Sequence, residues 1–370
     1  MPSLHYAVSN SIIINESHTP LYSDRYMKHN HFLILAISII AMTIAGCTRP
    51  ERIIDNSVDE WKILATTDAA PSALALLRQP DGEVTSSDVF AKTNGSPLPG
   101  KVTKIIEFRE NLYLLIPSAF QIIVVNRDYK QVASIDLSTS QRIPSDIAFG
   151  NATTAYIAHE NDTTVSVLDI VNFTVARSIT VGKRPIAIAA IGNQIFVANQ
   201  ASNTVSQIDT RTNTVVATHQ VPTAPTFIQP NIKNGHEVLV LSLGAGKIDS
   251  EVKTAAAISF IDSARIITKV TTLDDVLNGG SIDGHPVGMA ISTQDWAFIA
   301  VQNGVIRFDI RDQETYTLEL DQKFTGIFYN FRRDELLLLN NTEGTITNGL
   351  GEKKEVTFTL PFTVTSILGL

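Results

Sequence analysis

A repeat of about forty residues constrains the fold of this 370-residue chain more than any other feature. Segments 142–182 and 183–222 lie end to end and read "RIPSDIAFGNATTAYIAHENDTTVSVLDIVNFTVARSITVG" and "KRPIAIAAIGNQIFVANQASNTVSQIDTRTNTVVATHQVP". Each contains Pro-x-x-Ile, an aromatic-Ile/Val-Ala run, Thr-Val-Ser-x-Leu/Ile-Asp and a Thr-Val-rich run. Self-similarity at this period is typical of chains built from repeated structural units.

The start of the unit, Pro-x-x-apolar, can be followed along the chain. Its anchors are Val102, Pro144, Pro185, Pro225, Pro286, Phe324 and Pro361. Their spacings are 42, 41, 40, 61, 38 and 37 residues, so a single spacing is out of line. Within each unit, clusters of Asn, Asp, Gly and Thr separate four β-rich runs, which is typical of an up-and-down antiparallel sheet. Four such strands per unit predict a propeller blade.

The two ends of the chain complement each other. Residues 361–370 hold one anchor and one innermost strand, whereas "WKILATT", "SALALLR" and "EVTSSDVF" supply three strands that lack an innermost one. We therefore expect an all-β fold, a seven-bladed β-propeller of four-stranded antiparallel blades over residues 60–370. Pairing of the C-terminal strand with the N-terminal strands closes the ring, which leaves no free sheet edge between first and last blade.

Two of the units resemble a known repeat. The segments "YIAHENDTTVSVLD" and "FVANQASNTVSQID" resemble the YVTN family of β-propeller repeats, and residues 82–116 are similar to the first part of YncE-like bacterial propeller lipoproteins. The resemblance implies a propeller of the cell envelope. Relatives of this lipoprotein type include surface proteins that bind corrinoids, and the YVTN name is associated with surface layers.

The N-terminal segment has the layout of a secretory signal. Residues 32–46 carry no charge and are dominated by Leu, Ile and Ala. The run is shorter than the roughly 20 residues of a transmembrane helix and fits the ~7–15 residues of a signal h-region. Ile44, Ala45 and Gly46 directly before Cys47 resemble a bacterial lipobox, which implies lipidation of Cys47, the only cysteine.

This layout predicts four parts of the chain. Residues 1–26 are an upstream extension or disordered, 27–46 a lipoprotein signal peptide, 47–59 a lipid-anchored linker and 60–370 the propeller. Thr48 is not the Asp that retains some lipoproteins at the inner membrane. We therefore expect an outer membrane lipoprotein that faces the periplasm or the cell surface, with the leaflet left open.

Charge argues against nucleic acid as a partner. The formal net charge is -8, and removal of residues 1–46 leaves it unchanged. A single-stranded DNA site of the kind associated with a YncE-type propeller needs a basic groove interleaved with aromatic side chains. The only basic clusters are the pairs Lys183-Arg184, Arg332-Arg333 and Lys353-Lys354.

The enlarged spacing indicates a candidate binding surface. Connections after the second and the fourth strand of each blade emerge on the same face, here called the rim. The extra residues fall in "GAGKIDSEVKTAA" and "DDVLNGGSIDGH", both on the rim. Polar residues there are ligand-binding candidates, because loops on a rigid scaffold carry binding function. They are His159, Glu160, Asn161, Asn199, Gln200, Lys247, Asp249, Asp283, His285, Gln302, Asn303, Asn340 and Asn341.

Two alternatives remain for these residues. Asn at a strand end also satisfies the backbone of its own turn. His159, Glu160, Asp283 and His285 also fit a metal or acid-base site, although we expect neither a bound metal nor a cofactor.

Asn or Asp recurs at the end of the third strand, and we expect these residues to cap turns. Rotational symmetry keeps equivalent positions too far apart to share one metal ion. The residues are Asn126, Asp169, Asp209, Asp262 and Asp309.

Enzyme motifs are absent from the sequence. "SLGAGKID" lacks the earlier Gly and the Ser or Thr of a phosphate loop, and neither G-x-S-x-G nor H-E-x-x-H occurs. We expect no catalytic residues and a non-enzymatic protein. The predicted function is capture of a small polar nutrient, a corrinoid or a glycan, by a lipid-anchored propeller. The alternatives are a protein-protein interaction or surface-layer and adhesion propeller, and then a hydrolase or lyase.

Overall fold

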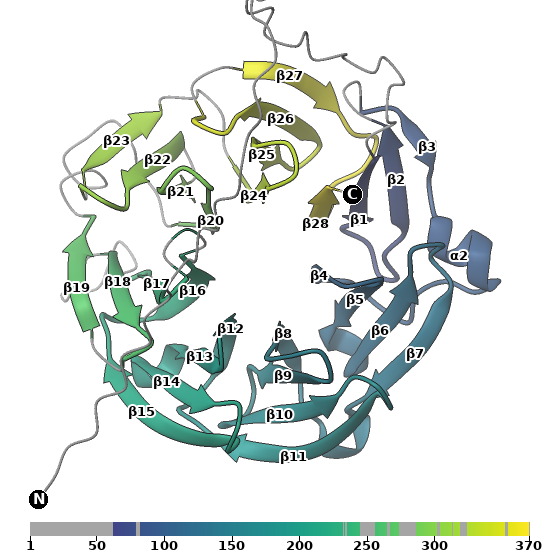
Figure 1. Cartoon of the computed structure of the whole chain (residues 1–370). Coiled ribbons are helices and arrows are strands. Elements are labelled where there is room, and N and C mark those ends of the chain that lie inside the picture. The colour runs from purple at the N-terminus through teal and green to yellow at the C-terminus, as the bar shows by residue number, and fades with distance from the viewer. Residues whose placement is uncertain are drawn as a thin grey trace, which may run out of the picture. The chain divides into compact units, whose positions relative to one another are not determined.

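The computed structural model describes residues 62–369 apart from 79–81, 232, 234, 245–255, 265–266, 274–285, 302–303, 313, 319–323 and 352–353. Cys47 and the predicted signal peptide lie outside the described residues. One compact unit spans residues 59–370, and its strands form seven four-stranded sheets. The predicted fold class is confirmed: the unit is a seven-bladed β-propeller (Figure 1).

Three blades carry the regular repeat. Blade 1 consists of β4 (Lys104–Phe108), β5 (Asn111–Ile116), β6 (Gln121–Asn126) and β7 (Gln131–Asp136). Blade 2 consists of β8 (Pro144–Phe149), β9 (Thr154–His159), β10 (Thr164–Asp169) and β11 (Thr174–Thr180). Blade 3 consists of β12 (Pro185–Ile191), β13 (Gln194–Asn199), β14 (Thr204–Asp209) and β15 (Thr214–Gln220). Short 3-10 helices, η1 (Pro117–Ala119), η2 (Ser138–Ser140) and η3 (Gln200–Ser202), lie in their connections.

Three further blades continue the ring. Blade 4 consists of β16 (Pro225–Pro230), β17 (Glu237–Ser242), β18 (Ala257–Asp262) and β19 (Ile267–Thr272). Blade 5 consists of β20 (Gly288–Ile291), β21 (Trp296–Val301), β22 (Gly304–Asp309) and β23 (Thr315–Leu318). Blade 6 consists of β24 (Gly326–Asn330), β25 (Glu335–Asn340), β26 (Glu343–Asn348) and β27 (Lys354–Thr359).

The last sheet joins both ends of the unit, as predicted. This split blade has the order β28 (Val364–Gly369), β1 (Lys62–Thr67), β2 (Leu74–Arg78), β3 (Val84–Ser86). β28 pairs antiparallel with β1, and Leu64 lies opposite Leu368. β28 also contacts the innermost strands β4 and β24 of the neighbouring blades. The ring is therefore closed by hydrogen bonds between segments about 300 residues apart.

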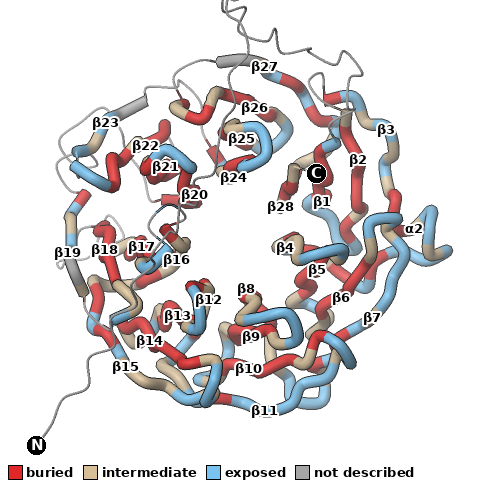
Figure 2. The backbone as a smooth tube through the Cα atoms, viewed as in Figure 1, coloured by how far each residue is buried: buried red, intermediate tan, exposed pale blue. Residues whose placement is uncertain are grey.

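Burial in the ring is greatest in the second and third strands and least in the fourth, whereas innermost strands such as β4 are only partly buried. Second strands such as β9 and third strands such as β10 are buried over nearly their whole length, because neighbouring blades cover both of their faces. The fourth strand β11 has one buried residue among seven. Figure 2 shows the same contrast, with β7 and β11 largely exposed at the periphery. The core thus consists of seven interfaces between blades.

The outer edges carry a recurring irregularity. Pairing between the third and fourth strands shifts register at equivalent places in blades 1, 2, 3, 4 and 6. A bulge at such a place twists the outer strand and interrupts its row of backbone groups. This disfavours the addition of a strand from another molecule.

One strand prediction was partly wrong. Of "EVTSSDVF", only Val84–Ser86 is a strand, and helix α2 (Val89–Asn94) follows. The Asp88 side chain caps this helix by accepting the backbone N–H of Ala91 at 3.0 Å, and Val89 and Phe90 are buried. No helix among the residues the structure describes is long and apolar enough to cross a membrane.

Repeated Pro residues begin strands in three blades, and the predicted turn-capping role of the Asx residues is confirmed at four of the five positions. Pro144, Pro185 and Pro225 each begin an innermost strand, where a missing N–H costs nothing. The Oδ1 atoms of Asp169 and Asp209 accept backbone N–H groups two residues ahead at 2.8 Å. Asn126 and Asp309 cap their turns in the same way.

Candidate functional site

The rim is enlarged in one blade, and the strand bounds show where. In blade 4, residues 243–256 connect β17 with β18 and residues 273–287 connect β19 with β20. In blades 2 and 3, four residues suffice at each of these places. The connection from β3 to β4 is also long, but it contains α2 and packs against the core through Phe90 and Leu98. Blade 4 therefore carries the extra rim residues that the spacing of the anchors predicted.

Several predicted rim residues belong to segments that the structure does not describe. They are Lys247, Asp249, Asp283, His285, Gln302 and Asn303. Their assignment to the ligand site stays a prediction, as does a metal or acid-base site that includes Asp283 and His285. Within the described ranges, no group of three or more His, Cys, Asp or Glu side chains could hold a metal ion.

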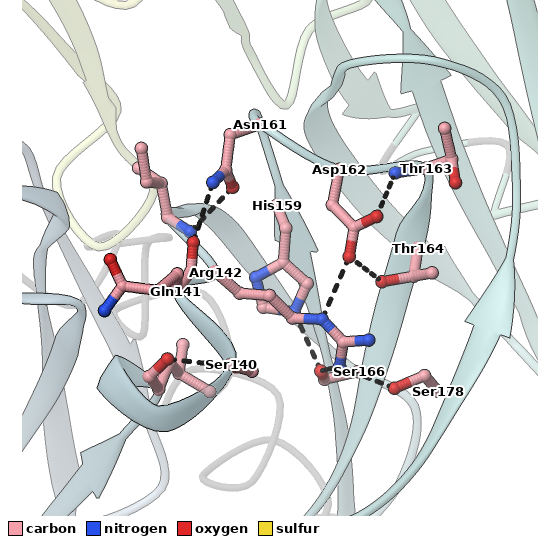
Figure 3. A network of polar contacts seen from close by, with 12 residues as sticks. Ser140, Gln141, Arg142, His159, Asn161, Asp162, Thr163, Thr164, Ser166 and Ser178 are labelled. Carbon is pink, nitrogen blue, oxygen red and sulfur yellow. Dashed lines mark hydrogen bonds and ion pairs between the residues drawn. The ribbon is translucent and has the colours of Figure 1, made fainter.

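His159 ends β9 as predicted, but its side chain lies beneath the rim surface. The residue is 0% exposed, and its Nε2 lies 2.8 Å from Ser166 Oγ of the adjacent strand β10 (Figure 3). Arg142, from the connection before β8, reaches the same serine and pairs with Asp162 at 2.9 Å. His159 therefore belongs to a network that joins two rim connections to the end of the blade.

The surroundings of His159 keep its ring neutral. Burial, which disfavours the charged ring, and the nearby Arg142 guanidinium lower the pKa of His159 to about 4, against a smaller opposing effect of Asp162. Asp162 itself accepts hydrogen bonds from Thr163 N at 2.7 Å and Thr164 Oγ1 at 2.8 Å. With Arg142, these bonds hold its pKa below the usual range despite its burial. The ion pair is thus part of the turn's own structure.

Asn199 repeats this arrangement in blade 3. It is 0% exposed, and its Nδ2 donates to Ser206 Oγ at 2.9 Å and to Thr204 Oγ1 at 3.1 Å. Gly182 of the preceding connection covers it so closely that a Cβ there would lie 2.7 Å from Asn199 Cβ. The residue fills a small closed space under the rim.

The other described candidates lie in the rim connections themselves. Asn161 is exposed, but its Oδ1 accepts the N–H of Ile143 and its Nδ2 donates to the carbonyl of Gln141. Gln200 donates to Thr226 Oγ1 of the next blade at 2.8 Å. These amides join their connection to the preceding rim connection and to the next blade, and neither bonds to the backbone of its own turn, which was the alternative that the sequence left open.

The remaining candidates differ in exposure. Glu160 is half-buried, and no side-chain bond to it is found among the described residues. Asn340 ends β25 half-buried, and the exposed Asn341 follows with φ 49°. The structure thus spreads the described candidates over the rims of blades 2, 3 and 6 and does not gather them around one point.

Sequence reasoning missed several polar residues that the fold brings together. Arg142 lies 20 residues before Asp162, and only the meeting of two rim connections unites them. Lys104 of β4 and Asp146 of β8 face each other between neighbouring innermost strands at 2.7 Å, and Asp146 is 3% exposed. For the ion pairs the sequence holds no local signal. For the partners of His159 and Asn199 it does, because the Ser of the Thr-Val-Ser motif lies seven residues after each of them.

A groove of about 440 Å³ lies on the face opposite the rim. It runs along the turns of blade 2 and reaches blade 3, and the exposed guanidinium of Arg177 lines it beside Asn172 and Asn213. Asn213 Oδ1 already accepts the hydroxyl of Tyr156 at 2.6 Å, and Asp169 caps its own turn. Most polar groups of this groove are therefore engaged within the protein.

Comparisons with known proteins agree with the fold. A family model described as "Domain of unknown function (DUF5074)" matches residues 68–348. Hydrazine synthase of Kuenenia stuttgartiensis is similar in structure, with a TM-score of 0.60 and 14% identity over 72% of this chain and 88% of that one.

Two structures of AztD from Citrobacter koseri are also similar. They have TM-scores of 0.53, for a structure described as apo, and 0.54. Each is 8% identical and covers 84% of this chain and 98% of its own. At these identities the likeness concerns the fold alone. No curated protein matches the sequence.

Proposed function

The chain belongs to the family described as domain of unknown function DUF5074, and we propose from its own geometry that it is a non-enzymatic binding propeller. The ligand is small and polar, and it is held at the rim. One observation carries the proposal: in an otherwise regular closed ring, both rim connections of blade 4 are long. Rigid scaffolds with extended loops on one face are the usual form of a binding protein.

Polar chemistry at the described rim supports a polar ligand. Glu160 is half-buried, and Lys183 and Arg184 are exposed in the connection between β11 and β12. No ion pair of these three residues occurs within the described ranges. Together with Lys247, Asp249, Asp283 and His285 of the long connections, they offer both signs of charge to a ligand. Corrinoids, which the YncE-like resemblance implies, and glycans present such polar groups.

Anchoring at a membrane is part of the same proposal. Cleavage before Cys47 and acylation of its thiol tether the propeller to the outer membrane through residues 47–59. Radiolabelled palmitate should be incorporated into the wild type and not into a Cys47→Ser variant. A wild type that incorporates no label contradicts the anchor and leaves the binding proposal to be judged separately.

Ligand-linked stabilisation tests the binding function. The form without the anchor, residues 49–370, is screened by thermal shift against corrinoids, glycans and metal salts. A ligand present at 100 times its Kd stabilises the folded state by about 2.7 kcal/mol. We expect a raised Tm with at least one corrinoid or glycan. Mass spectrometry of that compound after incubation should show it unchanged, since a converted compound indicates an enzyme.

A matched variant locates the site. Replacement of residues 245–255 with the dipeptide Asn-Gly shortens one long connection and leaves the strands of blade 4 intact. Its Tm without ligand should stay near that of the parent, and the ligand-induced shift should be lost. An unchanged shift places the site elsewhere. No shift with any compound favours the alternative of a protein partner.

A further inference from the structure

Three successive blades place a polar pair at one position beneath the rim. The pair consists of the last residue of the second strand and the third residue of the third strand. It is His159 with Ser166 in blade 2, Asn199 with Ser206 in blade 3 and Ser242 with Ser259 in blade 4. Five of the six residues are 0% exposed, and Ser206 is 2% exposed. All three pairs are therefore sealed from bulk solvent.

Direct hydrogen bonds satisfy these pairs incompletely. His159 reaches its serine through Nε2 and Asn199 through Nδ2, which leaves His159 Nδ1 and Asn199 Oδ1 without a partner in the described chain. In blade 4 the side chain of Ser242 is shorter than that of His159 or Asn199, and it makes no direct hydrogen bond to its serine. The hydroxyl groups of Ser242 and Ser259 are both buried without a hydrogen bond to any described residue.

The recurrence of these atoms at one level calls for a common cause. Nearly all buried polar atoms in folded proteins are paired, either with protein or with ordered water. A buried hydroxyl or carbonyl without a partner loses the hydration it had in the unfolded chain. Four of the buried side-chain atoms without a partner share the rim-side ends of three consecutive blades.

The chemistry of the four atoms defines the partner. Asn199 Oδ1 only accepts hydrogen bonds, so its partner must donate, whereas the partner of a serine hydroxyl can donate or accept. A cation is disfavoured at His159, because the Arg142 guanidinium already lies 3.4 Å from Ser166 Oγ. The described residues also contain no cluster of metal-binding side chains. Water is small and neutral, and it donates and accepts.

We propose that buried water molecules occupy the rim-side ends of these three blade interfaces. One water binds His159 Nδ1, one binds Asn199 Oδ1, and one bridges Ser242 and Ser259 where the neighbouring blades have a direct side-chain bond. Each water lies between the second and third strands of one blade, so the three waters occupy equivalent places in blades 2, 3 and 4. These water sites are independent of any ligand at the rim.

A crystal structure at a resolution that shows ordered waters is the direct test. We expect density for one water within ~2.7–3.2 Å of each named atom, the usual hydrogen-bond range. Three outcomes overturn the proposal: bonds from protein atoms to these groups, a bound metal or organic molecule in their place, or three dry interfaces.

Serine-to-alanine variants give a second test, in which the sign of the effect decides. If Ser242 and Ser259 are dry and unpaired, Ser242→Ala or Ser259→Ala removes a buried hydroxyl without a partner and raises the Tm. If a water bridges them, each variant deprives the water and the remaining serine of a partner and lowers the Tm. We expect a lower Tm for both single variants, and an increase for either one overturns the bridge.

The control is Ser134→Ala on the exposed strand β7. It makes the same chemical change in a strand without touching a buried interface, so its Tm should match that of the wild type. The shifts at 242 and 259 are read relative to this control, which removes the intrinsic difference between Ser and Ala in a strand.

Discussion

Asp146 Oδ2 accepts the backbone N–H of Ile188 from the neighbouring innermost strand at 3.1 Å. The split blade repeats this contact, because Ser366 Oγ accepts the backbone N–H of Ile105 in blade 1 at the same distance. At two interfaces between blades, a side-chain oxygen at the same place in the innermost strand therefore accepts a backbone N–H of the neighbouring innermost strand. The innermost strands are joined side to side by these bonds, although they belong to different sheets.

Replacement of Asp146 should show what this contact contributes. Asp146→Ala removes the acceptor for Ile188 N, for the adjacent Ile147 N and for Lys104 Nζ. Loss of hydrogen bonds to a buried charged group costs about 2 to 3 kcal/mol, measurable by denaturant unfolding. Asp146→Ser, which copies the residue at position 366, should recover part of that loss. Equal losses in both variants would show that the backbone contact contributes little.

Closure of the ring should depend on β28. Deletion of residues 361–370 exposes the paired edge of β1 and removes Ile367 and Leu368 from two core clusters. We expect loss of the cooperative thermal transition, or a strongly lowered Tm, followed by circular dichroism. A truncated protein with unchanged melting behaviour would contradict closure through this strand.

His159 should make stability sensitive to pH over a defined window. The pKa of His159 is about 4 in the folded protein and 6.5 for the ordinary side chain. Between these two pH values the unfolded chain binds a proton at this residue and the folded protein does not. The free energy of unfolding therefore keeps its full value above pH 6.5 and decreases as the pH falls towards 4. The loss reaches about 3 kcal/mol.

His159→Asn is the matched variant for this effect, because Asn199 occupies the equivalent position in blade 3 and bonds to Ser206. Denaturant unfolding of both proteins at several pH values should give a shallower dependence between 6.5 and 4 for the variant. Other titrating groups are common to both proteins and cancel in the difference, including His219 of β15, whose pKa is also lowered by burial. Identical slopes would show that His159 takes up a proton in the folded state.

Gly182 should be intolerant of a side chain. A Cβ there would meet Asn199 at 2.7 Å, and Asn199 is held by two hydrogen bonds and cannot easily move. Gly182→Ala should therefore lower stability by about 1 to 3 kcal/mol, the usual range for overpacking. At Gly326 the nearest atom to a new Cβ is Leu339 Cδ1 at an ordinary 3.4 Å, so Gly326→Ala should cause no loss. Thermal melts of the two variants compare them directly.

The fold could be predicted because each blade solves the same packing problem with the same residues. Pro144 and Pro185 start innermost strands, and Asp169 and Asp209 cap turns. Because such positions recur once per blade, the number of repeats along the chain gives the number of blades. The helix α2 was missed because its start depends on one capping residue, Asp88, within a run rich in β-forming residues.

The site was harder to predict, because strands buried on both faces carry no polar face that gives their orientation. A polar residue at the end of such a strand, His159 or Asn199, therefore reads as part of the surface. The structure shows that each side chain turns between blades towards a serine of the next strand. The partnership of Arg142 and Asp162 depends on the angle between connections, which no local pattern encodes.

The joint between β28 and β1 also sets the order of assembly. A chain leaving the ribosome or a translocation channel can complete blades 1 to 6 in sequence, but β1 waits without its partner until residues 364–369 arrive. A product that stops before residue 364 therefore leaves the edge of β1 unpaired, and such an edge can pair with a strand of another chain. Chaperones and proteases that recognise an unpaired strand edge or exposed apolar surface can distinguish such a product from a finished molecule.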